Sequence, residues 1–185
     1  RPIPNLVIAS PLNELDLRNL MYTGYAAFDG PFVIRYPRGK GEMKDWRNEM
    51  QVLPIGKGKK LRDGDDIAVL SIGPIGNEVI KAIEMVKEER VSIAHYDMIY
   101  LKPLDEELLH EIGQKYNRII TVENGVIKGG FGSAVLEFMA DNGYTPHVKR
   151  IGVPDAFIEH GSIPELYQLC GMDAESIAKQ LKKEN

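Results

Sequence analysis

Residues 67–97 read IAVLSIGPIGNEVIKAIEMVKEERVSIAHYD, and this stretch decides the fold class. Residues 67–72 form an apolar run with the length of a buried strand, and residues 92–97 predict a second strand. Between them, over about residues 76–89, apolar side chains recur at helical spacing: Val79, Ile80, Ile83 and Val86. A strand, a helix and a strand in this order predict two parallel strands joined by a helix.

The same alternation continues to the carboxyl end of the chain. The further predicted elements are a helix from Asp105, as N-cap, to Tyr116, a strand at 118–122, a helix at 132–143, a strand at 147–151, and helices at 162–169 and 173–183. Strands that alternate with helices predict an α/β fold, in which helices cover both faces of a mostly parallel sheet.

A Lys- and Gly-rich segment precedes the first of these strands. Residues 56–61 are expected to form a hairpin with residues 67–72 around the turn Arg62-Asp63-Gly64-Asp65. Charged side chains of this kind suit an exposed edge of a sheet. The sheet is therefore expected to have one antiparallel edge strand.

The first 45 residues predict a separate strand–helix–strand unit. A strand at 6–9 and a strand at 32–34 flank a helix that Asn13 can cap. The expected apolar face of this helix consists of Leu15, Leu17, Leu20 and Met21. Two strands and one helix cannot bury a core by themselves, so this unit is expected to need the rest of a larger sheet. Charged residues 40–54, with Trp46 as an apolar anchor, are expected to connect it to the next domain.

The composition narrows the classes of partner. The 185 residues carry a formal net charge of −4 and no basic stripe, which argues against a nucleic-acid partner. No apolar run reaches membrane-spanning length, so no membrane partner is expected. Cys170 is the single cysteine, which predicts no disulfide and fits the reducing cytoplasm.

Two arginines flank a Tyr-Pro step in the stretch IRYPRGKG, residues 34–41. Pro37 ends the preceding strand, so Arg35 and Arg38 are expected near its carboxyl end, where α/β sheets bind ligands. The planar guanidinium matches a phosphate or carboxylate with two parallel hydrogen bonds. The alternative is that both arginines form ordinary surface or interdomain salt bridges.

Two further motifs follow strands. Glu123 precedes the glycine-rich stretch Gly129–Ser133, whose backbone amides at a helix start could hold an anion; the alternative is a close backbone crossing against a neighbouring domain. Asp155, Glu159 and His160 could form an acid–base set, but one histidine is weak support for a metal site. A lone histidine before glycine is more often a turn residue.

Seven stretches in order carry a resemblance to a known family: IPNLVIASP, NELDLRNLMYTG, DGPFVIRYPRG, LPIGKG, YLKPLD, TVENG with GGFGSAVLE, and GVPDAFIEHG. Together they resemble the carboxyl-terminal part of the 1-deoxy-D-xylulose-5-phosphate synthase family, thiamine-diphosphate enzymes of the transketolase-like superfamily. The resemblance covers essentially the whole chain.

The resemblance implies a longer protein of three α/β domains. This chain would be the tail of a pyrimidine-binding domain (1–45), a linker (46–52) and a transketolase C-terminal domain (53–185). Thiamine diphosphate and Mg²⁺ would serve the full-length enzyme, and none is expected on this portion, which lacks the family's metal-binding stretch and its pyrimidine-activating glutamate. No catalytic, cofactor-binding or metal-ligating residue is therefore assigned.

The same resemblance implies a reaction and partners. The full-length enzyme would condense pyruvate with glyceraldehyde 3-phosphate, with loss of CO₂, at the entry to the non-mevalonate isoprenoid pathway and to thiamine precursors. It would be a cytoplasmic homodimer, and this portion alone would be inactive. Arg38 would bind the phosphate of the aldehyde, with Arg35 as a weaker candidate. The alternatives are a 2-oxo-acid dehydrogenase β subunit and a stand-alone α/β ligand-binding module.

Overall fold

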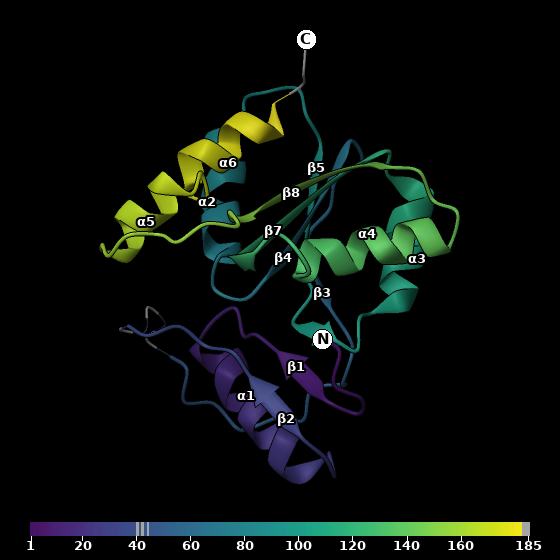
Figure 1. Ribbon diagram of the computed structural model, residues 1–185, viewed down its shortest axis with the longest axis vertical. Coiled ribbons are helices and arrows are strands. Elements are labelled where there is room, and N and C mark those ends of the chain that lie inside the picture. Colours follow the sequence, from purple (N-terminus) through teal and green to yellow (C-terminus); the bar gives the residue numbers. More distant parts are fainter. Residues whose placement is uncertain (40, 42, 44, 183–185) are drawn as a thin grey trace.

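The computed structural model describes residues 1–39, 41, 43 and 45–182, and Figure 1 gives the arrangement of its helices and strands. Lys40 and Lys44, in the predicted connection, and Lys183, the predicted end of the last helix, lie outside the described residues. In chain order the elements are β1 (Val7–Ala9), α1 (Glu14–Ala26), β2 (Phe32–Ile34), β3 (Lys59–Arg62), β4 (Ile67–Ile72), α2 (Gly76–Met85), β5 (Ile93–Asp97), β6 (Tyr100–Lys102), α3 (Glu106–Lys115), β7 (Arg118–Val126), α4 (Phe131–Asp141), β8 (His147–Val153), α5 (Ile163–Leu169) and α6 (Ala174–Leu181).

The larger sheet has five strands in the order β3-β5-β4-β7-β8. Strands β5, β4, β7 and β8 are parallel, and β3 runs antiparallel to β5 at one edge. Every residue of β4 and β5 is buried, as expected for central parallel strands that are covered on both faces. The predicted fold class, including the antiparallel edge strand, is confirmed.

Helices cover both faces of this sheet (Figure 1). Val69 of β4 belongs to a core shared with α2 and α6, whereas its neighbour Leu70 belongs to a core shared with α3 and α4. This division follows from the period of two in a strand, which points successive side chains to opposite faces. Helix α2 ends at Met85 rather than Glu89, although Val86 remains buried.

Predicted helix caps form in the structure. The Asn13 side chain accepts a hydrogen bond from the backbone N–H of Asp16, at 2.9 Å. The Asp105 side chain accepts one from the N–H of Leu108, at 3.2 Å. A cap of this kind pairs one of the four amides that a helix start leaves free, which stabilises the helix by about 1 kcal/mol.

The predicted hairpin is wrong, because β3 pairs with β5 and not with β4. Gly64 lies so close to the backbone of β5 that a Cβ atom there would fall 2.2 Å from the carbonyl carbon of Ile93. The phenol of Tyr116 donates to the Gly64 carbonyl at 2.7 Å and holds the turn in place. The chain therefore crosses β5 at residues 62–66, so that β3 and β4 lie on opposite sides of it.

A second, three-stranded sheet has the order β2-β1-β6. Strand β6 was not predicted; it runs antiparallel to β1, with Ala9 opposite Tyr100. Ile99, between β5 and β6, has a φ of 53°, a left-handed conformation that is rare for a β-branched residue and redirects the chain. A backbone ladder thus joins the N-terminal unit to the rest of the chain.

Helix α1 faces the protein with polar side chains, contrary to prediction. Of the four residues expected on its buried face, Leu20 is buried, Leu15 and Leu17 are half-buried, and Met21 is 62% exposed. Asn19 and Thr23 point inward instead. They accept hydrogen bonds from the backbone N–H groups of Gln51 (3.0 Å) and Leu53 (2.8 Å), and so hold the connecting segment.

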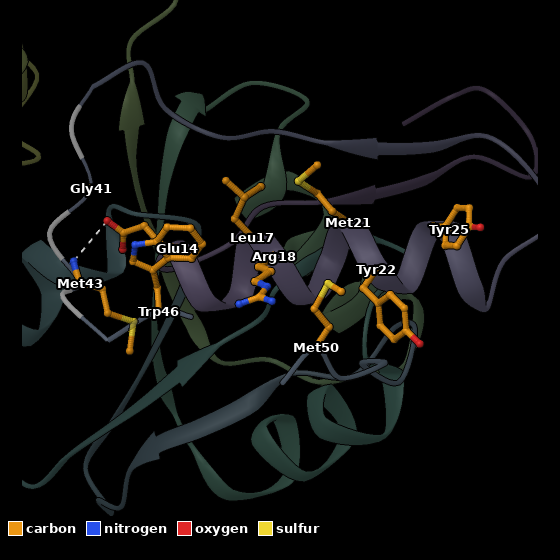
Figure 2. Close-up of a pocket in the computed structure, with 10 residues that line it drawn as sticks. All are labelled: Glu14, Leu17, Arg18, Met21, Tyr22, Tyr25, Gly41, Met43, Trp46 and Met50. Atoms are coloured by element: carbon orange, nitrogen blue, oxygen red, sulfur yellow. Dashed lines mark hydrogen bonds between the residues drawn. The ribbon is translucent and has the colours of Figure 1, made fainter. Parts of the chain in front are cut away.

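The apolar side chains of α1 line an open groove of about 770 Å³ (Figure 2). Trp46, the predicted anchor of the connection, is half-buried there, and the Arg47 guanidinium lies 4.9 Å from the centre of its ring. The lining residues are Glu14, Leu17, Arg18, Met21, Tyr22, Tyr25, Gly41, Met43, Trp46 and Met50.

Within the described part of the chain, no helix is long and apolar enough to span a membrane.

Candidate functional site

The two predicted site arginines lie just beyond the carboxyl end of β2, as the proline predicted. The backbone N–H of Arg35 still donates to the carbonyl of Ala9, at 2.8 Å, and extends the β1–β2 ladder by one residue. Tyr36, Pro37 and Arg38 follow with exposed side chains. Arg35 therefore ends the ladder, and Arg38 lies three residues further on, at the surface.

Arg35 connects the two sheets. Its guanidinium donates through Nη2 to the backbone carbonyl of Asn124, in the carboxyl-terminal part of β7. The side-chain amide of Asn124 in turn donates to the Tyr167 hydroxyl of α5, at 3.1 Å. On the other side, the Ser10 hydroxyl donates to the Arg35 carbonyl at 2.8 Å. Arg35 is thus held through its backbone and its side chain.

Arg38 differs from Arg35 in its surroundings. Both residues are exposed, but Arg38 forms no hydrogen bond or ion pair with the residues that the structure describes, whereas Arg35 bonds the Asn124 carbonyl. An arginine with free donors at the carboxyl end of a strand can bind a phosphate without breaking an existing contact. The arginines that the sequence presented as a pair therefore have different surroundings, and the role of each as a substrate ligand stays a prediction.

The amides at the start of α4 are occupied by the protein's own carboxylate. Glu123 is buried, and its two oxygens accept hydrogen bonds from the N–H groups of Phe131 and Gly132, each at 2.8 Å. A negative charge at a helix N-terminus is favourable because the helix dipole is positive there. An external anion at the amides of Phe131 and Gly132 would have to displace Glu123.

The glycines of this loop allow a close approach within the same unit, rather than against a neighbouring domain. A Cβ at Gly130 would lie 2.2 Å from a Glu123 carboxylate oxygen, and one at Gly132 would lie 2.5 Å from the Thr121 hydroxyl oxygen. Side chains larger than hydrogen would push Glu123 off the helix start. The loop therefore makes a close backbone approach, as one interpretation of the glycines predicted. Its neighbours are Glu123 and Thr121 of the same unit, and not a neighbouring domain.

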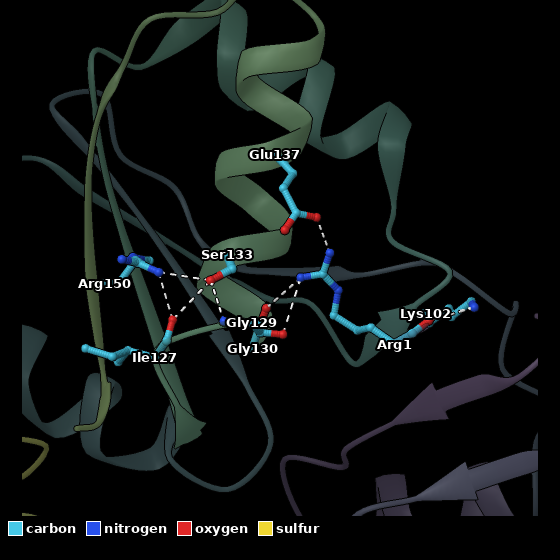
Figure 3. Close-up of polar contacts among 8 residues, drawn as sticks. All are labelled: Arg1, Lys102, Ile127, Gly129, Gly130, Ser133, Glu137 and Arg150. Carbon is cyan, nitrogen blue, oxygen red and sulfur yellow. Dashed lines mark hydrogen bonds and ion pairs between the residues drawn. The ribbon is translucent and has the colours of Figure 1, made fainter. Parts of the chain in front are cut away.

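Basic side chains cover the outer edge of the loop (Figure 3). Arg150 donates to the Ile127 carbonyl at 2.8 Å and to the Ser133 hydroxyl at 2.9 Å. Arg1 donates to the Gly130 carbonyl at 3.2 Å and forms an ion pair with Glu137. These guanidiniums hold backbone and carboxylate groups of the chain itself.

The Asp155, Glu159 and His160 set does not assemble. Asp155 forms an exposed ion pair with Lys128 at 3.0 Å, and Glu159 and His160 are exposed on the loop after β8. The described residues include no group of three or more His, Cys, Asp or Glu side chains placed to hold a metal ion. This loop therefore provides no acid–base centre in the described structure.

A small apolar cavity lies beside the Arg35 contact. It measures about 180 Å³ and has Asn124 and Tyr167 in its wall. Burial raises the pKa of the Tyr167 phenol and the Glu78 carboxylate adds to this, whereas the Arg35 charge lowers it. Its other lining residues are Val153, Ile158, Ile163, Leu166, Cys170 and Met172.

A buried polar cluster near the ends of β4 and β5 was not predicted. The Ser71 hydroxyl and His95 Nε2 are 2.8 Å apart, and burial lowers the pKa of His95 to about 4. Burial also raises the pKa of Asp97 to about 7. Asp97 Oδ2 has no hydrogen-bond partner among the described residues. Polar residues inside an otherwise apolar strand, at 95 and 97, were the signal that could have indicated this cluster.

Comparison with known proteins gives a consistent family assignment. Residues 56–177 match the family model described as transketolase, C-terminal domain. A 1-deoxy-D-xylulose-5-phosphate synthase of Bacteroides thetaiotaomicron is 61% identical over the whole chain, and the synthase of Porphyromonas gingivalis is 60% identical over 96% of it. The chain spans only 29% and 28% of the lengths of these two relatives.

A solved structure has the same fold. A chain described as a split gene transketolase, inactive beta4 tetramer, superposes with a TM-score of 0.84 at 28% sequence identity. The match covers 99% of the present chain and 60% of that chain. It therefore includes the N-terminal unit as well as the region that the family model covers.

Proposed function

The chain belongs to the transketolase C-terminal domain family, and on that premise we propose that it is the carboxyl-terminal portion of a 1-deoxy-D-xylulose-5-phosphate synthase. The complete enzyme would condense pyruvate with glyceraldehyde 3-phosphate, with loss of CO₂, at the entry to the isoprenoid and thiamine pathways. Relatives about 60% identical over the full chain support this assignment. Their name favours the synthase over a 2-oxo-acid dehydrogenase β subunit.

Arg38 would bind the phosphate of the aldehyde substrate. The observation that carries this proposal is its exposed guanidinium, which is three residues beyond the Arg35 anchor and not engaged by described residues. A phosphate is remote from the reacting carbon, so its binding energy can be used to position the aldehyde. Neither Arg38 nor Arg35 takes part in the bond-making steps under this proposal.

The thiamine diphosphate and Mg²⁺ of such an enzyme would be bound by the part of the protein outside this chain. The described residues offer no set of ligands for a metal ion, so they do not fit that role. The proposal divides the chain into the tail of a pyrimidine-binding domain (1–45), a linker (46–52) and the C-terminal domain (53–185).

We further propose that the 185 residues alone are inactive, and that the complete enzyme is a cytoplasmic homodimer. The structural relative is described as a split gene transketolase, inactive beta4 tetramer, which supports the first of these two points by analogy. The contribution of this chain would then be to shape the entrance to the active site and to contribute to the contact between subunits.

The Arg38 assignment can be tested by steady-state kinetics of the enzyme expressed from its complete gene. Arg38→Ala should raise KM for glyceraldehyde 3-phosphate roughly 10- to 100-fold, because a charge-assisted hydrogen bond is worth about 1.5–3 kcal/mol. KM for pyruvate should change little. Arg38→Lys should recover only part of the loss, because an ammonium group cannot reproduce the bidentate guanidinium.

Arg90→Ala is the matched control, since Arg90 is an exposed arginine in the turn before β5. It should leave both Michaelis constants at their wild-type values. An unchanged aldehyde KM in Arg38→Ala would contradict the assignment of Arg38, and absence of product from the complete wild-type enzyme would contradict the proposed reaction.

A further inference from the structure

We propose that Arg35 is a positioning residue that orients Arg38 for the substrate phosphate and does not bind the phosphate itself. This inference rests on the proposed function, because it assigns a task to Arg35 in the same site. The contact that carries it is the hydrogen bond from the Arg35 guanidinium to the Asn124 carbonyl, which spans from the small sheet to the large one.

Arg35 is held at its backbone and at one guanidinium nitrogen. Its N–H donates to Ala9 and its carbonyl accepts from Ser10, each at 2.8 Å, so the backbone cannot rotate freely. Its side chain then reaches across to β7. A phosphate that used the Nη2 donor of Arg35 would compete for it with the Asn124 carbonyl.

The anchor on the other side is also fixed. Asn124 lies in β7 next to Glu123, the last residue paired with β4, and between Val122 and Val126, where the pairing with β8 shifts register. Its side-chain amide donates to the Tyr167 hydroxyl. The preceding residue, Glu123, is tied to the start of α4 by two hydrogen bonds. Arg35 therefore contacts β7 at an irregular stretch that the hydrogen bonds of Asn124 and Glu123 hold in place.

The chain transmits this constraint over a short distance. Only Tyr36 and Pro37 separate Arg35 from Arg38, and the proline ring fixes one of the intervening φ angles. Tyr36 is in turn biased toward extended geometry because it precedes proline. A shift of Arg35 would therefore move the Arg38 guanidinium, and small displacements of a binding group are costly for a positioned substrate.

The test compares Arg35→Gln with Arg118→Gln in the complete enzyme. Arg118 is a matched control because its guanidinium also donates to backbone carbonyls, those of Gln180 (2.7 Å) and Lys182 (3.0 Å), but at the opposite end of β7. Both variants should lower the melting temperature. Only Arg35→Gln should raise KM for glyceraldehyde 3-phosphate, roughly tenfold, with KM for pyruvate unchanged.

A double-mutant cycle separates positioning from direct binding. If Arg35 acts through Arg38, then Arg35→Gln should cause no further rise in the aldehyde KM when Arg38 is already alanine. A further rise of about tenfold would mean that Arg35 contacts the phosphate and would overturn the inference. An aldehyde KM as unaffected as that of Arg118→Gln would also overturn it.

Two further outcomes are informative. If Arg35→Gln does not fold, Arg35→Lys keeps a donor for the carbonyl and should raise the aldehyde KM about threefold; an unchanged KM would overturn the inference. If Arg38→Ala alone leaves the aldehyde KM unchanged, the assignment of Arg38 fails and this inference fails with it. If Arg35→Gln leaves the aldehyde KM unchanged while Arg38→Ala raises it, only the inference about Arg35 fails and the assignment of Arg38 stands.

Discussion

At the scale of single residues, Asp97 is unusual because it places a carboxyl group inside the core. It is fully buried at the end of β5, and one of its oxygens has no partner among the described residues. The charged groups that act on it are the buried Asp16 of α1 and Lys59 of β3, which pair with each other at 2.7 Å. Lys59 bonds Asp16 and acts on Asp97 only through its charge, so a protonated Asp97 leaves these three groups with no net charge.

This arrangement predicts a pH-dependent stability that Asp97→Asn should change. The folded-state pKa of about 7 lies above the unfolded value of 3.8, so the folded form loses stability as pH rises from about 4 to about 7. Three pKa units correspond to about 4 kcal/mol. Asp97→Asn should therefore gain stability relative to wild type across this range and keep the gain above pH 7.

Chemical denaturation of the complete enzyme between pH 4 and 8 measures this difference. His95 acts in the opposite direction, because its depressed pKa of about 4 removes stability as pH falls below 6.5, and the comparison with Asp97→Asn isolates the aspartate. Asp29→Asn, at an exposed position, is the control. A wild-type to Asp97→Asn difference that is the same at pH 4 and pH 8 would contradict the prediction.

At the scale of elements, the junction between β7 and α4 depends on Glu123. Glu123→Gln should reduce the free energy of unfolding by about 2–3 kcal/mol, because the amide keeps one acceptor and turns an N–H toward the N–H groups of Phe131 and Gly132. Glu175→Gln changes an exposed residue in the first turn of α6. It should cost less than about 0.5 kcal/mol, as is usual for surface substitutions. Equal losses in urea denaturation would show that the buried cap has no special importance.

At the scale of the whole molecule, Ser10 and Gly73 mark where the two sheets meet. Gly73 has a φ of +80°, and a Cβ there would lie 2.3 Å from the Ser10 hydroxyl oxygen. Gly143 has a similar φ of +73° with open space around it. Gly143→Ala should cost about 1–2 kcal/mol from backbone strain alone. Gly73→Ala should cost about 1–3 kcal/mol more than Gly143→Ala, which is the usual penalty for overpacking.

Thermal denaturation of the two variants in the complete enzyme measures the difference. Because the strain is matched, the excess cost of Gly73→Ala reports the packing of the N-terminal unit on the larger sheet. Equal melting temperatures for Gly73→Ala and Gly143→Ala would mean that this contact does not stabilise the molecule.

The sequence by itself determined the layered architecture and most of the local structure. The alternation of apolar strands with amphipathic helices predicted the mostly parallel sheet, and Asn13 and Asp105 were recognisable as caps. Pro37 correctly predicted the end of β2 before Arg35 and Arg38. These features depend on residues within a few positions of one another, and such local preferences can be read along the chain.

Only the tertiary structure decided which segments become neighbours. It placed β3 beside β5, brought β6 to β1, and turned the polar side of α1 inward to hold the connecting segment. It also gave the two exposed arginines different contacts, because Arg35 bonds the Asn124 carbonyl and Arg38 bonds no described residue. Each of these depends on backbone groups that find hydrogen-bond partners far away in the sequence, and side-chain periodicity carries no information about those partners.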